Sequence, residues 1–132
     1  MKTIRPVPMI AILWFLALMA SAPTRILAEQ NQVWTGTLVD ASCYTTDNSQ
    51  VGNDHMDMKG CATACLRMGR PAGLLTPDKK FFILLVPSPD IASYAGKTIR
   101  VTGKLRHGSI LVDKLEAKKG EGWENVKFNT MM

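Results

Sequence analysis

The sequence predicts a mainly β protein, a small closed or half-closed barrel of about five strands with one short helix after the first strand. Short segments rich in Val, Ile, Thr and aromatic residues recur between turn residues, which is the pattern of small barrels and sandwiches. One segment carries the start and stop residues of a helix. The length of 132 residues fits one domain, and 46% hydrophobic with 20% charged residues is the composition of a folded chain.

The chain begins with the pattern of a secretory signal peptide. Lys2 and Arg5 precede an unbroken apolar run, MIAILWFLALMA, and small residues follow it. A membrane-spanning helix needs about 20 apolar residues, so this run is too short to be a stable span. We expect residues 1–28 to be a signal peptide cleaved after Ala28, with Ala22 as the alternative position. The protein is therefore expected to be secreted or periplasmic, with no membrane span after cleavage.

The first half of the mature chain is expected to contain a strand, a loop and a helix. Gln32 to Asp40, QVWTGTLVD, has the composition of a strand, and the polar segment Ala41 to Asn53 predicts a loop. Asp57 to Gly69, DMKGCATACLRMG, is the helix candidate, with Asp57 as its N-cap and Gly69 as the residue that ends it. One face of this helix is expected to pack in the core: Met58, Cys61, Cys65 and Met68.

The second half begins with two strands joined by a turn. Gly73 to Thr76 and Lys80 to Val86 flank Pro77-Asp78-Lys79, in which proline presets a turn conformation. The run FFILLV from Phe81 to Val86 is continuously apolar, which indicates a strand buried on both sides. Pro87-Ser88-Pro89 is expected to stop that strand.

A long hairpin follows. Lys97 to Arg106 alternates, so that Ile99, Val101, Gly103 and Leu105 are predicted to face one way. His107-Gly108 indicates a two-residue turn, and a break of phase in the next strand predicts a bulge near Val112 or Asp113. We expect the barrel domain to cover residues 29–119. Residues 120–132 are expected to form a C-terminal tail or a short edge strand at Val126 to Phe128.

Two segments of the mature chain carry a resemblance. Trp34 to Cys43, WTGTLVDASC, looks like an opening strand that ends in a cysteine and is followed by a Cys-x-x-x-Cys helix. Tyr94 to Lys104, YAGKTIRVTGK, looks like a closing hairpin. Together they resemble a family of small secreted bacterial OB-fold-like domains of uncharacterised function, over Val33 to Ala117. The resemblance implies an OB-like five-stranded barrel and no activity.

The candidate chemistry lies in Cys43, His55, Cys61 and Cys65, which are all three cysteines and one of the two histidines. An odd number of cysteines in an exported chain leaves one thiol without an internal partner. Cys61 and Cys65 are one helical turn apart, a geometry that disfavours a bond between them. The first interpretation is therefore a disulfide from Cys43 to one of them. Such a bridge closes a loop of about 20 residues and contributes ~3 kcal/mol.

The alternative interpretation is a metal site. Cys43, His55, Cys61 and Cys65 offer three sulfurs and one imidazole, a set that suits tetrahedral Zn²⁺ or, by its softness, Cu(I). The site requires His55 to lie in the loop before the helix, because in a helix that ran back to Asp54 it would face away from Cys61. Thiol redox chemistry at the same cysteines is a third interpretation.

No enzyme class is indicated. A cysteine paired with His55 and oriented by Asp54 or Asp57 is a combination that many exported chains offer, and the serines lack a nucleophile-elbow context. We therefore expect no catalytic residue, and no cofactor unless zinc or copper binds.

The charge pattern predicts a binding face. The net charge is +5, part of which belongs to the leader. Arg100, Lys104 and Arg106 form an outward row on the predicted strand Lys97 to Arg106. Aromatic residues are 7% and are expected in the core, which leaves no stacking platforms for nucleic acid.

These observations predict an exported β-barrel module with a non-enzymatic binding or structural role in the cell envelope. Its helix is stapled to the first strand by a disulfide, and its partner is an anionic envelope polymer or another envelope protein. The alternative is a metal-binding or thiol-redox protein built on the Cys/His cluster.

Overall fold

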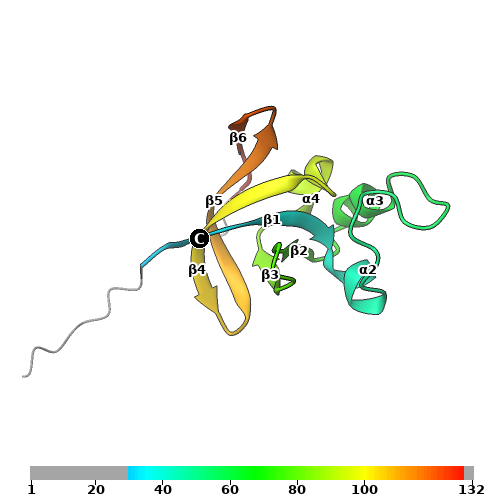
Figure 1. Ribbon diagram of the computed structural model, residues 1–132, viewed down its shortest axis with the longest axis horizontal. Coiled ribbons are helices and arrows are strands. Elements are labelled where there is room, and N and C mark those ends of the chain that lie inside the picture. The colour runs from blue at the N-terminus through cyan, green and yellow to red at the C-terminus, as the bar shows by residue number, and fades with distance from the viewer. Residues whose placement is uncertain (1–29, 130–132) are drawn as a thin grey trace, which may run out of the picture.

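The computed structural model describes residues 30–129, so the predicted signal peptide lies outside the described residues. This part of the chain is mainly β, as the sequence predicts (Figure 1). In chain order its elements are β1 (Gln32–Asp40), α2 (Ala41–Thr46), α3 (Cys61–Arg67), β2 (Ala72–Leu75), β3 (Phe81–Leu85), α4 (Ser88–Ile91), the 3₁₀ helix η2 (Ala92–Tyr94), β4 (Thr98–Arg106), β5 (Ser109–Lys119) and β6 (Gly122–Val126).

The six strands form one sheet in the order β3-β2-β1-β4-β5-β6. Neighbours in that order are antiparallel, and an additional parallel pairing sets β3 beside β5, with Leu84 opposite Ile110. The pairings therefore run from β3 through β2, β1 and β4 to β5, and β5 pairs with β3 again. Strand β6 extends the sheet beyond β5 at the remaining edge.

One hydrophobic core joins the strands to the helices. Leu38 of β1, Leu74 of β2 and Leu115 of β5 are fully buried, and they share this core with Leu66 of α3 and Ile91 of α4. The helices α3 and α4 lie beside each other at the same side of the sheet as α2 (Figure 1). None of the helices among residues 30–129 is long and apolar enough to cross a bilayer.

The hairpin of β4 and β5 confirms the predicted turn and bulge. His107 and Gly108 both have positive φ, at 47° and 81°, as a two-residue hairpin turn requires. Thr102 lies opposite Lys114 and Gly103 lies opposite Val112, so Asp113 is the extra residue of the bulge. Leu105 is an exception to the predicted inward face, since it is 42% exposed near the end of the hairpin that projects from the domain.

The predicted loop after β1 is wrong over Ala41–Thr46, which form α2. The cause is Asp40, whose Oδ1 accepts hydrogen bonds from the backbone N–H groups of Ser42 at 2.8 Å and Cys43 at 3.4 Å. This is an N-cap, which satisfies donors that a helix start otherwise leaves unpaired.

The next helix is shorter than predicted. It begins at Cys61 rather than after Asp57, because residues 55–58 form a tight turn in which His55 pairs with Met58. Gly69, at φ 86°, follows the helix end as predicted. The expected core packing of the two methionines is wrong, since Met58 is 56% exposed and Met68 is 73% exposed.

Three further features differ from expectation: two added helices, the burial of one strand and the position of the last strand. Helices α4 and η2 follow Pro87, where the sequence indicated only the end of a strand. Strand β3 is not buried on both sides, since Leu84 is buried but Leu85 is 49% exposed. The C-terminal strand is Gly122–Val126 rather than Val126 to Phe128.

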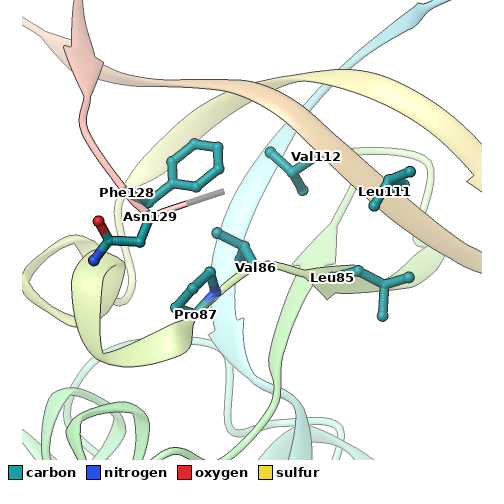
Figure 2. A pocket seen from close by; sticks show the side chains of 7 residues that line it. All are labelled: Leu85, Val86, Pro87, Leu111, Val112, Phe128 and Asn129. Carbon is teal, nitrogen blue, oxygen red and sulfur yellow. The ribbon is translucent and has the colours of Figure 1, made fainter. Parts of the chain in front are cut away.

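A largely apolar pocket of about 270 Å³ lies beside the seam of β3 and β5 (Figure 2). Leu85 and Leu111 line it from the two strands, and Phe128 lines it from the segment after β6. Its lining contains no titratable or nucleophilic side chain among the described residues. It therefore offers contact area but no reactive group.

Candidate metal centre

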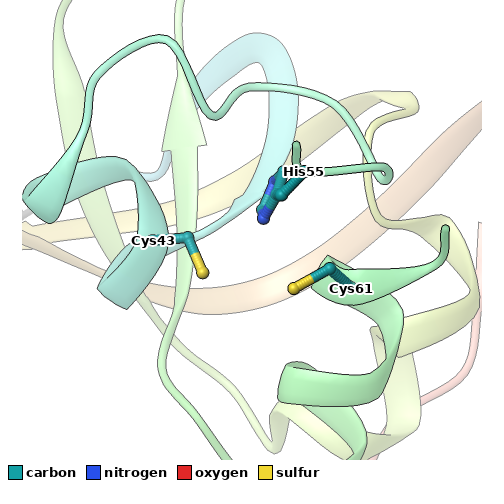
Figure 3. Close-up of side chains that lie close together, drawn as sticks. All are labelled: Cys43, His55 and Cys61. Atoms are coloured by element: carbon teal, nitrogen blue, oxygen red, sulfur yellow. The ribbon is translucent and has the colours of Figure 1, made fainter. Parts of the chain in front are cut away.

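Three segments that are separate in the sequence bring Cys43, His55 and Cys61 together. Cys43 comes from α2, His55 from the turn before α3, and Cys61 is the first residue of α3 (Figure 3). One ligand atom from each, the two sulfurs and a ring nitrogen, lies within 4.8 Å of the others. The structure thus places three of the four predicted ligands around one point.

Backbone contacts position these segments. The N–H of Ala41, at the start of α2, donates to the carbonyl of Pro71 at 3.0 Å, which holds α2 beside the chain that leaves α3. The carbonyl of Asn53 accepts from Ala62 N–H at 3.0 Å, and its side chain accepts from Thr63 N–H at 2.9 Å. The segment that carries His55 is thereby tied to the first turn of α3.

His55 is oriented for coordination through Nδ1. The residue is 2% exposed, and its Nε2 lies 2.9 Å from the carbonyl oxygen of Gly52. A carbonyl only accepts, so Nε2 carries the proton and the lone pair of the neutral ring is on Nδ1. Among residues 30–129, Nδ1 is the one buried side-chain nitrogen or oxygen without a hydrogen-bond partner. Metal-binding histidines commonly show this arrangement, in which the second nitrogen donates to a carbonyl.

Asp40 forms the other side of the cluster. It is fully buried, and its Oδ2 accepts a hydrogen bond from the Cys43 thiol at 3.2 Å. Asp40, Cys43 and Cys65 make a second group with ligand atoms within 4.8 Å of one another. No ion pair within the described part of the chain involves Asp40. Buried carboxylates are ordinarily paired with a cation, which makes this cluster suited to a positive ion.

The surroundings of Cys43 and Cys65 keep their thiols protonated when no cation is bound. Burial, and after it the hydrogen bond to Asp40 and the charge of Asp40, raise the pKa of Cys43 to about 12. Burial also raises the pKa of Cys65, again with Asp40 adding to the effect. Such thiols are weak nucleophiles, and a bound cation reverses the balance by favouring the thiolate.

A pocket of about 380 Å³ gives access to the cluster. Cys43, His55 and Cys61 line it together with Met56, Arg70 and polar residues of the segment after α2. His55 and Cys61 are buried, Cys43 is half-buried and Met56 is 85% exposed, so the pocket runs from the ligand group to the solvent.

Cys65 is the fourth predicted ligand. It neighbours Cys61 and Asp40 and shares the group of Asp40 and Cys43, so all three thiols lie in one cluster. All three cysteines are present as thiols, and the expected disulfide stays a prediction.

Sequence reasoning did not single out Asp40 as a site residue. A local signal was available. Asp40 ends the predicted strand and directly precedes Ala-Ser-Cys, and an aspartate at the start of a helix is a favourable N-cap. Its proximity to Cys65 has no signal in the local sequence.

Asp54 does not orient His55 towards a cysteine, so the cysteine–histidine–aspartate combination that the sequence offers is not assembled through this carboxylate. The carboxylate of Asp54 accepts the backbone N–H of Gly60 at 2.7 Å, and His55 is positioned by the Gly52 carbonyl instead. Asp57 is exposed in the turn that follows His55.

The predicted basic face is partly engaged in internal contacts. Arg100 donates to Glu116 through Nε at 2.9 Å, pairs with it through Nη2 at 2.8 Å, and lies 4.6 Å from the centre of the Trp123 ring. Lys104 and Arg106 continue the row towards the end of the hairpin. Glu116 thus reduces the positive charge of this face at Arg100.

Comparison with protein-family models, with curated proteins and with solved structures gives no match, so the function is argued from the cluster itself.

Proposed function

We propose that this protein is an exported metal-binding domain that holds one thiophilic ion, Zn(II) or Cu(I), between Cys43, His55 and Cys61. Cys65 and Asp40 complete the surroundings of the ion. The proposed scaffold is an OB-like barrel, which the return of the strand pairings from β5 to β3 supports.

The buried, unpartnered Nδ1 of His55 is the observation that carries this proposal. Leaving a buried polar atom without a hydrogen bond costs about 1–3 kcal/mol, so a folded protein rarely keeps one without a reason. A metal ion accepts the lone pair that no protein donor reaches. The two sulfurs that lie within 4.8 Å of a ring nitrogen of His55 are the ligands that such an ion needs.

Charge also favours a cation. Asp40 is fully buried and lies against the Cys43 thiol, so the cluster concentrates negative charge as soon as a thiol ionises. A bound ion neutralises that charge, and each coordinating thiol releases its proton to solvent. Binding is therefore expected to release protons and to raise the stability of the fold.

The test compares the two histidines of the chain. Reduced protein is loaded anaerobically with Zn(II) in one sample and with Cu(I) in another, freed of excess metal and analysed for metal content, for the wild type, His55→Ala and His107→Ala. His107 lies exposed in the hairpin turn and is the matched control. We expect about one ion per chain in the wild type and in His107→Ala, and loss of the ion in His55→Ala. Equal metal content in the two variants, or retention of neither Zn(II) nor Cu(I) by the wild type, contradicts the proposal.

A second candidate is the non-enzymatic envelope module stapled by a disulfide, with an anionic polymer or another envelope protein as partner. The observation that favours it is the position of the Cys43 sulfur, which shares one group with Cys61 and another with Cys65. Thiol titration of the exported, oxidised protein separates the two. One free thiol and no metal is the result for the stapled module, whereas three thiols and bound metal is the result for the metal site.

A further inference from the structure

We propose that the ion of this site is copper(I) and that the thioether of Met56 receives it at the mouth of the pocket before it passes to Cys43, His55 and Cys61. The inference rests on the proposed metal site and names its substrate and its entry ligand. Met56 belongs to neither of the two groups of candidate metal ligands.

Met56 is placed at the entrance by a defined turn. His55 N–H donates to the Met58 carbonyl at 3.1 Å and Met58 N–H donates to the His55 carbonyl at 2.9 Å, which closes the turn around Met56. The backbone of Met56 has φ 51°, a conformation that residues other than glycine adopt rarely and at a cost. The side chain is 85% exposed, although methionine is apolar, and it lines the same pocket as the three ligands.

The donors that converge at one point of this pocket are soft, although oxygen donors from Ser42, Thr46, Asp47 and Gln50 also line it. Two sulfurs and one imidazole nitrogen converge within 4.8 Å, and Met56, which lines the same pocket, adds a thioether. Thiolate and thioether ligands select Cu(I), whereas zinc sites of this size use four closed thiolate, imidazole or carboxylate ligands. Copper(I) is satisfied by three ligands, and the group of Cys43, His55 and Cys61 supplies three, with Cys65 and Asp40 in the neighbouring group that shares Cys43.

The carboxylate of Asp47, which lines the pocket, already accepts hydrogen bonds from neighbouring residues. Asp47 accepts hydrogen bonds at Oδ1 from Ser49, through N–H at 2.9 Å and the hydroxyl at 2.7 Å, and at Oδ2 from Gln50 at 3.2 Å. Arg70 adds a positive charge to the same lining, and its Coulomb repulsion of a divalent ion is about twice that of a monovalent one. Both features disfavour Zn(II) at the entrance relative to Cu(I).

The transfer is a ligand exchange without redox change. Copper enters bound to the Met56 sulfur, that bond breaks as bonds to the Cys43 and Cys61 sulfurs and to Nδ1 of His55 form, and the two thiol protons go to solvent. The copper remains in its +1 state throughout.

The test uses Met56→Leu with Met68→Leu as the matched control. Leucine keeps the size and apolarity of methionine and removes the sulfur. Met68 is 73% exposed and does not line the pocket. Reduced, metal-free protein is mixed anaerobically with the Cu(I) complex of bicinchoninate, and the rate at which the coloured complex disappears is followed. A parallel equilibrium competition offers Cu(I) and Zn(II) at equal concentrations.

We expect Met56→Leu to take up copper about tenfold more slowly than the wild type, by analogy with the loss when a residue next to a metal is removed. Met68→Leu is expected to match the wild type, and copper is expected to exclude zinc in the competition. Equal rates in Met56→Leu and Met68→Leu overturn the role of Met56, and retention of zinc over copper overturns the identity of the ion. Neither of these results touches the metal site itself, which fails if the wild type retains no ion of either kind.

Discussion

The thiol of Cys43 donates to Oδ2 of Asp40 at 3.2 Å, while Oδ1 of the same carboxylate caps the helix that carries Cys43. One buried side chain therefore both starts α2 and sets the charge beside the candidate metal ligands. The two roles can be separated, because a cap needs an acceptor oxygen whereas the charge needs an ionised carboxylate.

The variant Asp40→Asn is expected to weaken metal binding while leaving the fold in place. Asparagine is as good an N-cap as aspartate, so the hydrogen bonds from Ser42 and Cys43 can be kept. Loss of the negative charge is expected to lower metal affinity about tenfold, as substitutions beside metal ligands do. Competition with a chelator measures the affinity and urea unfolding measures the stability. Asp47→Asn is the control, and an equal loss of affinity in both variants contradicts a specific role for Asp40.

We expect Cys43 to be alkylated slowly in reduced, metal-free protein. Its pKa is raised to about 12, chiefly by burial and then by Asp40, so the thiolate is scarce at neutral pH. The rate of reaction with iodoacetamide is expected to keep rising with pH beyond the ordinary thiol range of about 8.5. Peptide mass mapping after short exposure measures the rate at each cysteine. A plateau in the rate at Cys43 near the ordinary thiol pKa goes against this prediction.

Glu116 is expected to make the fold sensitive to acid. Hydrogen bonds from Lys114 and Arg100 lower its pKa below the ordinary value, so the ionised form is favoured in the folded protein. The stability that this carboxylate contributes is fully present above the pKa of Glu116 in the unfolded chain. It is lost as the pH falls through the lower pKa of Glu116 in the folded protein. The free energy of unfolding, measured with urea, is therefore expected to fall less between neutral and acid pH in Glu116→Gln than in the wild type. The exposed Glu121→Gln is the control, and an unchanged pH dependence in Glu116→Gln is the contrary outcome.

Gly103→Ala is expected to destabilise the hairpin at its bulge. A Cβ at this position would collide with the Leu111 carbonyl oxygen, which belongs to the neighbouring strand and cannot move independently. Overpacking of this kind costs about 1–3 kcal/mol. The control is Gly122→Ala, because the nearest atom to a Cβ there is the Lys119 carbonyl oxygen at 3.8 Å. Thermal unfolding compares the two variants, and equal melting temperatures contradict the prediction.

Export is expected to remove residues 1–28. The intact mass of protein recovered from the periplasm or medium of a bacterial host should then correspond to a chain that begins at Glu29. A chain that begins at Pro23 supports the alternative cleavage position, and a full-length chain retained in the cells contradicts the predicted signal peptide.

Local patterns were enough to predict much of the fold. The alternation of Ile99 and Val101 indicated the buried face of β4, and His107-Gly108 indicated the hairpin turn. Both depend on the backbone and side-chain preferences of neighbouring residues, which the sequence carries directly. The bulge at Asp113 was visible for the same reason, as a break of phase in the apolar pattern.

Two helix boundaries depend on contacts between residues two or three positions apart, which composition alone did not indicate. The helix α2 depends on the Asp40 cap, and the late start of α3 depends on the turn that pairs His55 with Met58. Composition alone favoured a loop in the first case and a longer helix in the second. The exposure of Met58 and Met68, which lie just before and just after α3, depends instead on how the helix packs against the core.

The sequence by itself determined which residues are candidates for the chemistry, since three cysteines and His55 are close together in the chain. It also indicated the strands β1 to β5 and the hairpin turn, because these follow from local composition and periodicity. Only the tertiary structure decided that Asp40 joins the cluster, that Nδ1 of His55 has no protein partner and that Met56 stands at the pocket entrance. Burial and the direction of a lone pair are set by segments that meet across the fold, and no local pattern encodes where those segments meet.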